Sequence, residues 1–186
     1  MISHALKFFF VHIPKTGGTS LAYLLHRHCE NVVKHQFAAD LMQECRGAVD
    51  YFRFTVIRNP WEREVSRYCF QKQNPSLATH QEANRLSFKE WLRSRHNDTE
   101  FMMFYGAPML DWIADKEGNL LVDYIARLER IHRDWEIISD ALKIDGVLPW
   151  LNRSEHSDYA EFYDDESRAM VGDVYAKDIE FFDYEF

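Results

Sequence analysis

A short segment near the N-terminus restricts most strongly how this chain can fold. An apolar run ends in Pro-Lys-Thr-Gly-Gly-Thr-Ser at residues 14–20, and a helix-like pattern follows at once. Glycines let backbone N–H groups approach an anion closely, and the new helix points its positive N-terminus toward that anion. Lys15 adds a mobile charge, and Thr16, Thr19 and Ser20 add hydroxyl donors. The segment therefore predicts a strand, a phosphate-binding loop and a helix, in a chain that binds a phosphate or sulfate ester.

The order of residues in this loop differs from that of the nucleotide triphosphatases. Their loop reads G-x-x-x-x-G-K-[ST], with the lysine after the last glycine. Here Lys15 precedes Gly17 and Gly18, and no glycine lies upstream of it. The alternative interpretation of the segment is a simple Gly-Gly turn between a strand and a helix, with Lys15 exposed to solvent.

A second anion-binding pattern starts where another predicted strand, residues 51–58, ends. Arg58 is the last residue of this strand, and Asn59 and Pro60 are typical of a helix N-cap and first helical position. Ser66 follows in the second turn of the predicted helix. Because a guanidinium group and a hydroxyl suit a phosphate monoester, Arg58 and Ser66 are predicted to bind one. The alternative is an ordinary amphipathic helix with surface arginines.

Together the two motifs resemble those of sulfotransferases that use 3′-phosphoadenosine 5′-phosphosulfate (PAPS). Pro-Lys-Thr-Gly-Gly-Thr-Ser resembles their 5′-phosphosulfate loop, and Val-Ile-Arg-Asn-Pro-Trp-Glu-Arg-x-x-Ser-x-Tyr resembles their 3′-phosphate motif. Residues 123–138 look like the Arg-x-Glu strand and helix of carbohydrate sulfotransferases, residues 148–156 like their late loop over the nucleotide, and residues 164–182 like their last helix. The family is the one that includes heparan sulfate 2-O-sulfotransferases and related small bacterial enzymes. The resemblance is weakest at residues 71–118, where acceptor recognition is expected to vary.

This resemblance implies a fold, an activity and a set of binding residues. The fold is α/β, a single-domain, P-loop-like three-layer fold over residues 1–186, with a parallel central sheet flanked by helices. The activity is transfer of the sulfuryl group of PAPS to a hydroxyl of a carbohydrate or small-molecule acceptor, with adenosine 3′,5′-bisphosphate (PAP) as product and no metal required. The implied nucleotide-binding residues are Lys15, Thr16, Gly17, Gly18, Thr19, Ser20, Arg58, Ser66, Asn152, Arg153 and Ser154.

Sulfuryl transfer needs a cation beside the leaving phosphate and a base for the acceptor hydroxyl. Lys15 is the predicted cation. His35 is the predicted base, because it lies between the two anion motifs, in the interval where the resembling 2-O-sulfotransferases carry their catalytic histidine. The local sequence Lys-His-Gln departs from their His-Gly-His pattern, so the match is one of position. His12 and Glu62 remain alternative bases, with His80 more distant.

Composition narrows the class of partner. The net charge of −8, from 22 basic and 30 acidic residues, argues against a general nucleic-acid binder and against long-range attraction of a polyanionic acceptor. The sequence holds no run of about 18 apolar residues, so no membrane span is predicted. Three cysteines without C-x-x-C or metal-ligand spacing predict reduced thiols and a cytoplasmic location. The oligomeric state is left open.

Predicted strands and helices alternate along the chain, which favours a parallel sheet with its ligand at the carboxyl ends of the strands. Two other functions remain in view. A P-loop phosphotransferase is disfavoured because the chain lacks Gly-Lys-Ser/Thr. In addition, the predicted strand at residues 51–58 ends in Arg58 and not in the acidic residue that such an enzyme would carry. A non-catalytic nucleotide-binding domain is the other.

Strands are predicted at 7–13, 31–34, 51–58 and twice within 112–124 around a turn at 117–119; helices at 18–29, 37–45, 60–73, 87–95, 129–142 and 165–182; and a loop at 71–86.

Overall fold

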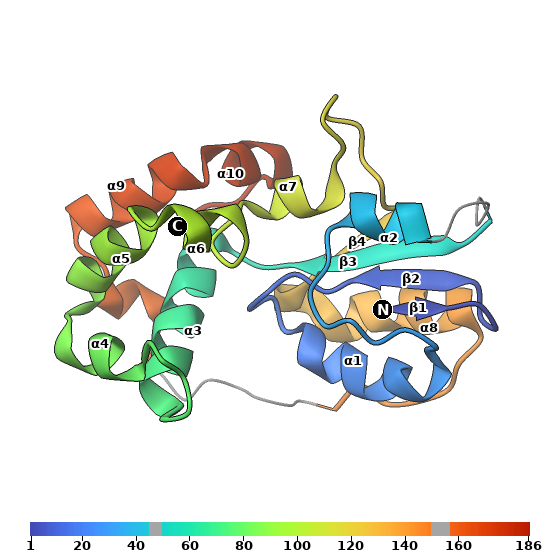
Figure 1. The fold of residues 1–186 in the computed structure, drawn as a ribbon. Coiled ribbons are helices and arrows are strands. Elements are labelled where there is room, and N and C mark those ends of the chain that lie inside the picture. Colours follow the sequence, from blue (N-terminus) through green and yellow to red (C-terminus); the bar gives the residue numbers. More distant parts are fainter. Residues whose placement is uncertain (45–49, 150–156) are drawn as a thin grey trace. The chain divides into compact units, whose positions relative to one another are not determined.

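The structure of the chain is a computed structural model that describes residues 1–44, 50–149 and 157–186. Figure 1 shows its helices and strands, coloured from blue at the N-terminus to red at the C-terminus. Strands β2 and β3 are each followed along the chain by a helix, as the alternating sequence pattern predicts.

The chain divides into two compact units. The first unit is built from Met1–Arg58 and Met109–Asn152, and the second from Asn59–Pro108 and Arg153–Phe186. The first unit holds the sheet, and the second is helical in its described part. The single domain expected over residues 1–186 stays a prediction.

The first unit is organised around a four-stranded sheet in the order β1-β2-β3-β4. Strands β2, β3 and β4 are parallel, whereas the short β1 pairs antiparallel with β2 at the edge. Aromatic and β-branched residues dominate β2 and β3, as expected for strands that are covered on both faces. The predicted α/β fold with a mostly parallel sheet is thereby confirmed. The strands are β1 (Ile2–Ser3), β2 (Phe8–Val11), β3 (Phe52–Ile57) and β4 (Tyr124–Arg127).

Helices cover the sheet of the first unit on both sides (Figure 1). Helices α1 (Gly18–Leu25) and α8 (Ile131–Leu142) pack on the face that carries Phe10 and Phe54, whose rings stack with centroids 5.1 Å apart. The opposite side chains of β2 are equally buried, and α2 (Ala38–Glu44) contacts both β2 and α7 (Met109–Ile113). Burial on both faces makes this sheet a rigid support for the loops at its carboxyl ends.

The second unit begins with the longest described helix, α3 (Pro60–Gln73). The side-chain oxygen of Asn59 accepts hydrogen bonds from the N–H groups of Trp61 and Glu62, at 3.0 and 3.4 Å, and Pro60 occupies the first turn. Both ends of this helix agree with the sequence-based prediction. The other helices of this unit are α4 (His80–Arg85), α5 (Phe88–His96), α6 (Thr99–Met103), α9 (Asp165–Val174) and α10 (Ala176–Phe182).

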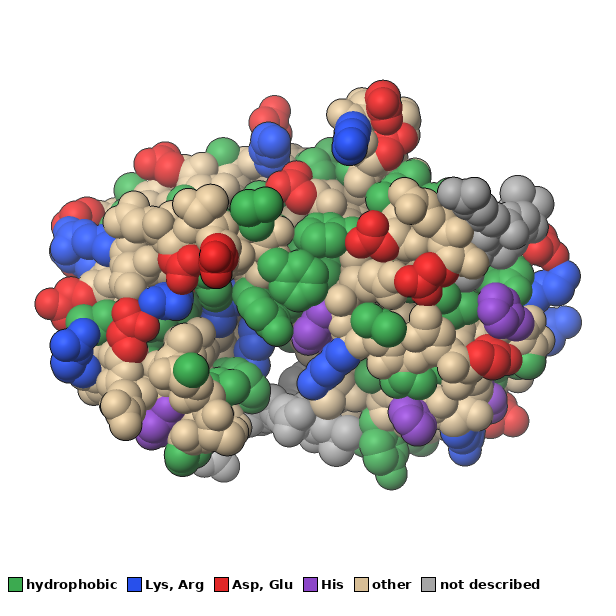
Figure 2. Space-filling model, viewed as in Figure 1, with side chains coloured by type: hydrophobic (Ala, Val, Ile, Leu, Met, Phe, Trp, Pro, Cys, Tyr) green, Lys and Arg blue, Asp and Glu red, His purple; other side chains and the backbone are tan. Residues whose placement is uncertain are grey.

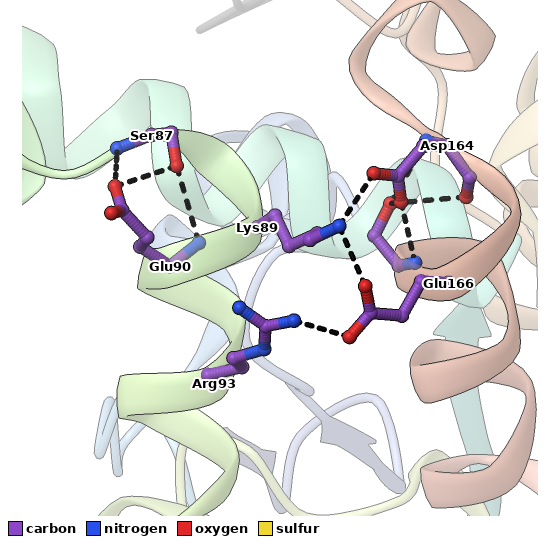
Figure 3. Close-up of polar contacts among 7 residues, drawn as sticks. Ser87, Lys89, Glu90, Arg93, Asp164 and Glu166 are labelled. Atoms are coloured by element: carbon purple, nitrogen blue, oxygen red, sulfur yellow. Dashed lines mark hydrogen bonds and ion pairs between the residues drawn. The ribbon is translucent and has the colours of Figure 1, made fainter.

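Polar contacts join α5 to α9 within the second unit (Figure 3). Lys89 donates to the carboxylates of Asp164 and Glu166, at 2.8 and 2.7 Å, and Arg93 pairs with Glu166 as well. The predicted cap of α5 is confirmed, because Ser87 and Glu90 form a reciprocal capping box. These ion pairs are solvent-exposed, so they contribute little to stability and mainly fix how the two helices pack.

Acidic and basic side chains are interspersed over the face of the molecule seen in Figure 2, with no continuous basic surface in that view. This distribution fits the acidic composition of the chain. Among the residues that the structure describes, no helix has both the length and the apolar character needed to cross a membrane.

The predicted strand pair within residues 112–124 is wrong. Trp112 lies in α7, and only one isolated bridge, between Ala114 and Leu120, joins the two sides of the following turn. The carboxylate of Asp115 accepts the N–H groups that shape this turn, and Gly118 has a φ of +86°. The apolar spacing of the segment fits a short helix with one buried face as well as a strand, and tertiary burial of Trp112 decides between them.

Three other predicted boundaries also differ. Residues 31–34 form no strand, since only Asn31 bridges to Ile2. The predicted loop at 71–86 contains α4, which buries Ala83 against α3 and α5. The last predicted helix is two helices, α9 and α10, that meet at Tyr175.

Candidate active site

The loop between β2 and α1 holds its shape through its own hydrogen bonds. The buried hydroxyl of Thr16 donates to the carbonyl of Ile13 at 3.0 Å, and the N–H of Ser20 donates to the carbonyl of Gly17 at 3.3 Å. Lys15 adopts a left-handed φ of +67°, which costs a residue with a side chain about 1–2 kcal/mol. Backbone strain at this position indicates that the surrounding contacts, rather than local preference, set the loop conformation.

The two glycines of the loop are required for different reasons. Gly17 has a φ of +80°, and a Cβ atom there would lie 2.4 Å from Cδ1 of Leu128. Gly18 is the first residue of α1, and a Cβ atom there would lie 2.3 Å from Cδ2 of the His12 ring. Because Gly17 has no side chain to cap α1, no side chain caps the N–H groups of Gly18 and Thr19, which can therefore face an anion.

Arg58 and Lys15 lie together at the carboxyl ends of the adjacent parallel strands β3 and β2. Nη1 of Arg58 donates to the carbonyl of Lys15 at 3.3 Å, and only 8% of Arg58 is exposed. The strand ends are held in register by the hydroxyl of Thr55, which donates to the carbonyl of Val11 at 2.8 Å. The structure therefore places one residue from each of the two sequence motifs at the same edge of the sheet.

His35 lies beside this loop, in the irregular segment before α2 rather than at a strand end. Its Nδ1 lies 2.8 Å from the carbonyl oxygen of His12. A carbonyl can only accept, so Nδ1 carries the hydrogen and Nε2 of the neutral ring keeps a lone pair. Burial lowers the pKa of His35 below its ordinary value of 6.5, helped by the charges of Lys34 and Lys15 and opposed by the hydrogen bond to His12. A neutral, partly exposed imidazole with a fixed tautomer can act as a general base at neutral pH.

The alternative bases lie in other surroundings. His12 is only 3% exposed, and burial, with the neighbouring His35 and Lys34, lowers its pKa well below the usual range. Its ring stacks on Phe10 and lies against Gly18 of the loop. Glu62 is in the first turn of α3 and His80 begins α4, both in the second unit.

A model of the sulfotransferase family matches residues 1–185, nearly the whole chain. The chain belongs to the sulfotransferase family. The predicted resemblance to sulfotransferases is thus confirmed, and with it a transferase activity that moves a sulfuryl group to an acceptor.

The fold of this chain is similar to that of a sulfotransferase whose structure has been solved. A crystal structure of mouse sulfotransferase SULT7A1 complexed with PAP matches it with a TM-score of 0.61, over 96% of this chain and 86% of the mouse chain. Sequence identity is 12%, so the likeness shows the shared fold. No curated protein sequence matches the chain significantly.

The first unit of the sulfotransferase brings together most of the predicted site residues. They are Lys15, Thr16, Gly17, Gly18, Thr19, Ser20, His35 and Arg58. Ser66 is 2% exposed on α3 in the second unit. Asn152, Arg153 and Ser154 lie outside the described residues. Within the described part of the chain, no group of three or more His, Cys, Asp or Glu side chains is placed to hold a metal ion.

Local sequence patterns do not predict how Trp112 and Leu128 pack beside the site. Phe37 stacks on the buried Trp112 with ring centroids 4.3 Å apart, and the His35 ring meets Trp112 edge-on at 6.5 Å. Leu128, just after β4, packs where a side chain at Gly17 would lie. Both contacts join segments that are far apart in the sequence, so no local pattern signals them.

The second unit of the sulfotransferase contains a buried polar cluster that the sequence did not reveal. The carboxylate of Glu64 pairs with Arg67 and accepts a hydrogen bond from the hydroxyl of Tyr175 at 2.6 Å. Although burial opposes it, Arg67 with His96 and Tyr175 lowers the pKa of Glu64 overall. Burial lowers the pKa of the adjacent Arg63 to about 10. This cluster lies on the inner face of α3, the helix that carries Ser66.

Proposed function

We propose that this sulfotransferase transfers the sulfuryl group of PAPS to a hydroxyl of a carbohydrate or small-molecule acceptor, with His35 as general base. The observation that carries the proposal is the meeting of Lys15 and Arg58 at the carboxyl ends of β2 and β3, beside His35. A saccharide acceptor is favoured by the resemblance to carbohydrate sulfotransferases. The fold shared with a PAP-bound sulfotransferase supports the choice of nucleotide.

The loop residues suit the 5′ side of such a nucleotide. The glycines expose the N–H groups at the start of α1, and Thr19 and Ser20 add hydroxyls there. Thr16 contributes through its backbone, because its hydroxyl already donates to Ile13. Arg58 is proposed to hold the 3′-phosphate, and Ser66, Asn152, Arg153 and Ser154 are proposed as further nucleotide-binding residues.

The residues of the first unit divide the chemistry between them. PAPS supplies the activated sulfuryl group and its phosphate leaving group. His35 takes the proton of the acceptor hydroxyl on Nε2 while the acceptor oxygen attacks sulfur in line. Lys15 stabilises the negative charge that the leaving phosphate oxygen acquires as its bond to sulfur breaks. No step in this scheme calls for a metal ion.

Two measurements test the proposal. Calorimetry should show tighter binding of PAP than of ATP with magnesium, and labelled PAPS should transfer sulfate to at least one member of a panel of saccharides and hydroxylated small molecules. Preference for ATP with magnesium would instead favour a phosphotransferase. Tight PAP binding with no transfer to any acceptor would favour a non-catalytic nucleotide-binding domain. The location is proposed to be cytoplasmic, as the cysteine pattern of the sequence predicts.

A further inference from the structure

We propose that His12 is a positioning residue whose ring sets the distance between the start of α1 and the imidazole of His35. The role rests on the proposed function, since it concerns how the loop at residues 14–20 and the base His35 are held together. His12 connects β2 to the loop, and its buried side chain stacks on Phe10 of β2 and lies against Gly18 at the start of α1.

The His12 ring is enclosed by three groups of the same unit. It stacks on Phe10 with centroids 5.4 Å apart, and the His35 ring lies 4.7 Å away. On the side that faces the loop, the His12 ring fills the space that a side chain at Gly18 would need. A Cβ atom on Gly18 would lie 2.3 Å from Cδ2 and 2.5 Å from Nε2 of His12. The fit between this ring and Gly18 therefore determines how closely the N-terminus of α1 approaches His35.

Main chain and side chain of His12 act on the site separately. Its carbonyl accepts the Nδ1 hydrogen of His35, a contact that survives any substitution of the side chain. Within the described residues, Nδ1 of the His12 ring has no hydrogen-bond partner, so an apolar replacement loses no hydrogen bond at that atom. Substitution at position 12 thus removes the ring and leaves the carbonyl contact to His35 in place.

The fit between Gly18 and the His12 ring can be tested by adding a methyl group at position 18 with and without the ring at position 12. Gly18→Ala alone should weaken PAP binding about tenfold or more and lower Tm, because the new methyl group overlaps the ring. In the His12→Ala background the same change should weaken binding less than about threefold, since the space is vacated and alanine suits a helical residue. Cζ of Phe10, 3.1 Å from the position of the new methyl group, then needs only a small shift.

Gly17→Ala is the matched control. A residue there needs a φ of +80° and would overlap Leu128, so the damage should be the same with and without the His12 ring. Equal effects of Gly18→Ala in both backgrounds, by binding and by Tm, would overturn the proposed role.

The effect on the base has its own readout. In His12→Ala, ¹⁵N NMR of the His35 ring in the nucleotide-free protein should still show hydrogen on Nδ1, while the His35 pKa rises toward its ordinary value as burial is relieved. Lys34 and Lys15 still face His35 in this variant and act as before. The acid limb of kcat/KM should move upward equally, and kcat should fall more than KM changes. An unmoved His35 pKa would contradict the role.

Failure of the inference and failure of the proposed function give different results. Tight PAP binding by the unmutated chain with no coupling between positions 12 and 18 removes only the positioning role. Absence of PAP binding by the unmutated chain removes the proposed function, while the coupling of the two positions in Tm remains measurable.

Discussion

Arg58 donates a hydrogen bond to the carbonyl oxygen of Lys15, at 3.3 Å, so the residue proposed for the 3′-phosphate directly contacts the residue proposed for the leaving group. Lys15 is held there in a left-handed conformation that its side chain disfavours. In the proposed function, this one backbone carbonyl links the residue that recognises the nucleotide to the residue that stabilises the developing charge.

Arg58→Ala should remove most of the preference for PAP over 5′-AMP, because a charge-assisted contact contributes on the order of 1.5–3 kcal/mol. The variant should also lower kcat at saturating PAPS, since Lys15 loses its backbone contact. Calorimetry with both nucleotides and steady-state kinetics check the two parts. If the unmutated protein binds PAP and 5′-AMP equally, Arg58 has no such role.

Lys15→Ala should lower turnover by about 10²-fold or more with a much smaller loss of PAP affinity, because the charge it stabilises develops only during transfer. Lys15→Gly is the matched control, since it removes the same charge but suits the φ of +67°. Both variants should lose activity equally, while Lys15→Gly unfolds at higher Tm than Lys15→Ala. A parallel loss of affinity and rate would make Lys15 a simple anchor.

His35→Ala should reduce sulfate transfer by about 10²–10⁴-fold and leave PAP binding intact. Because the pKa of His35 is below 6.5, kcat/KM should stay high through neutral pH and fall only as pH drops through that lowered value. The same shift means that unfolded His35 binds a proton which the folded residue does not, so the free energy of unfolding falls as pH decreases from 6.5. Near-full activity of His35→Ala would move the base to another residue.

Glu64→Ala should destabilise the second unit by about 3–5 kcal/mol, because it leaves Arg67 buried without its carboxylate partner. Urea unfolding monitored by tryptophan fluorescence measures the change. Lys89→Ala removes the exposed pairs with Asp164 and Glu166 and should change stability far less. Similar losses of stability in the two variants would show that the buried Glu64–Arg67 pair contributes no more to stability than the exposed pairs.

Local signals explain which parts of the fold and the site were predictable. The loop at residues 14–20 and helix α3 can be predicted because a few neighbouring residues determine them. These residues are the glycines, the Asn-Pro helix start and the flanking apolar runs. The strand pair predicted near Trp112 failed because a short apolar segment fits a helix or a strand, and burial decides. The tautomer of His35 and the Glu64–Tyr175 contact depend on groups brought together only by the folded chain.

The hydroxyl of Thr16 donates to the carbonyl of Ile13, and Leu128 fills the space beside Gly17, so contacts within the first unit already hold the loop at residues 14–20 in shape. A ligand that meets such a loop does not have to order it. Little conformational entropy is then lost on association, and more of the gross interaction energy appears as affinity. We therefore expect the nucleotide to bind a loop whose conformation is already formed, without coupled ordering of the loop.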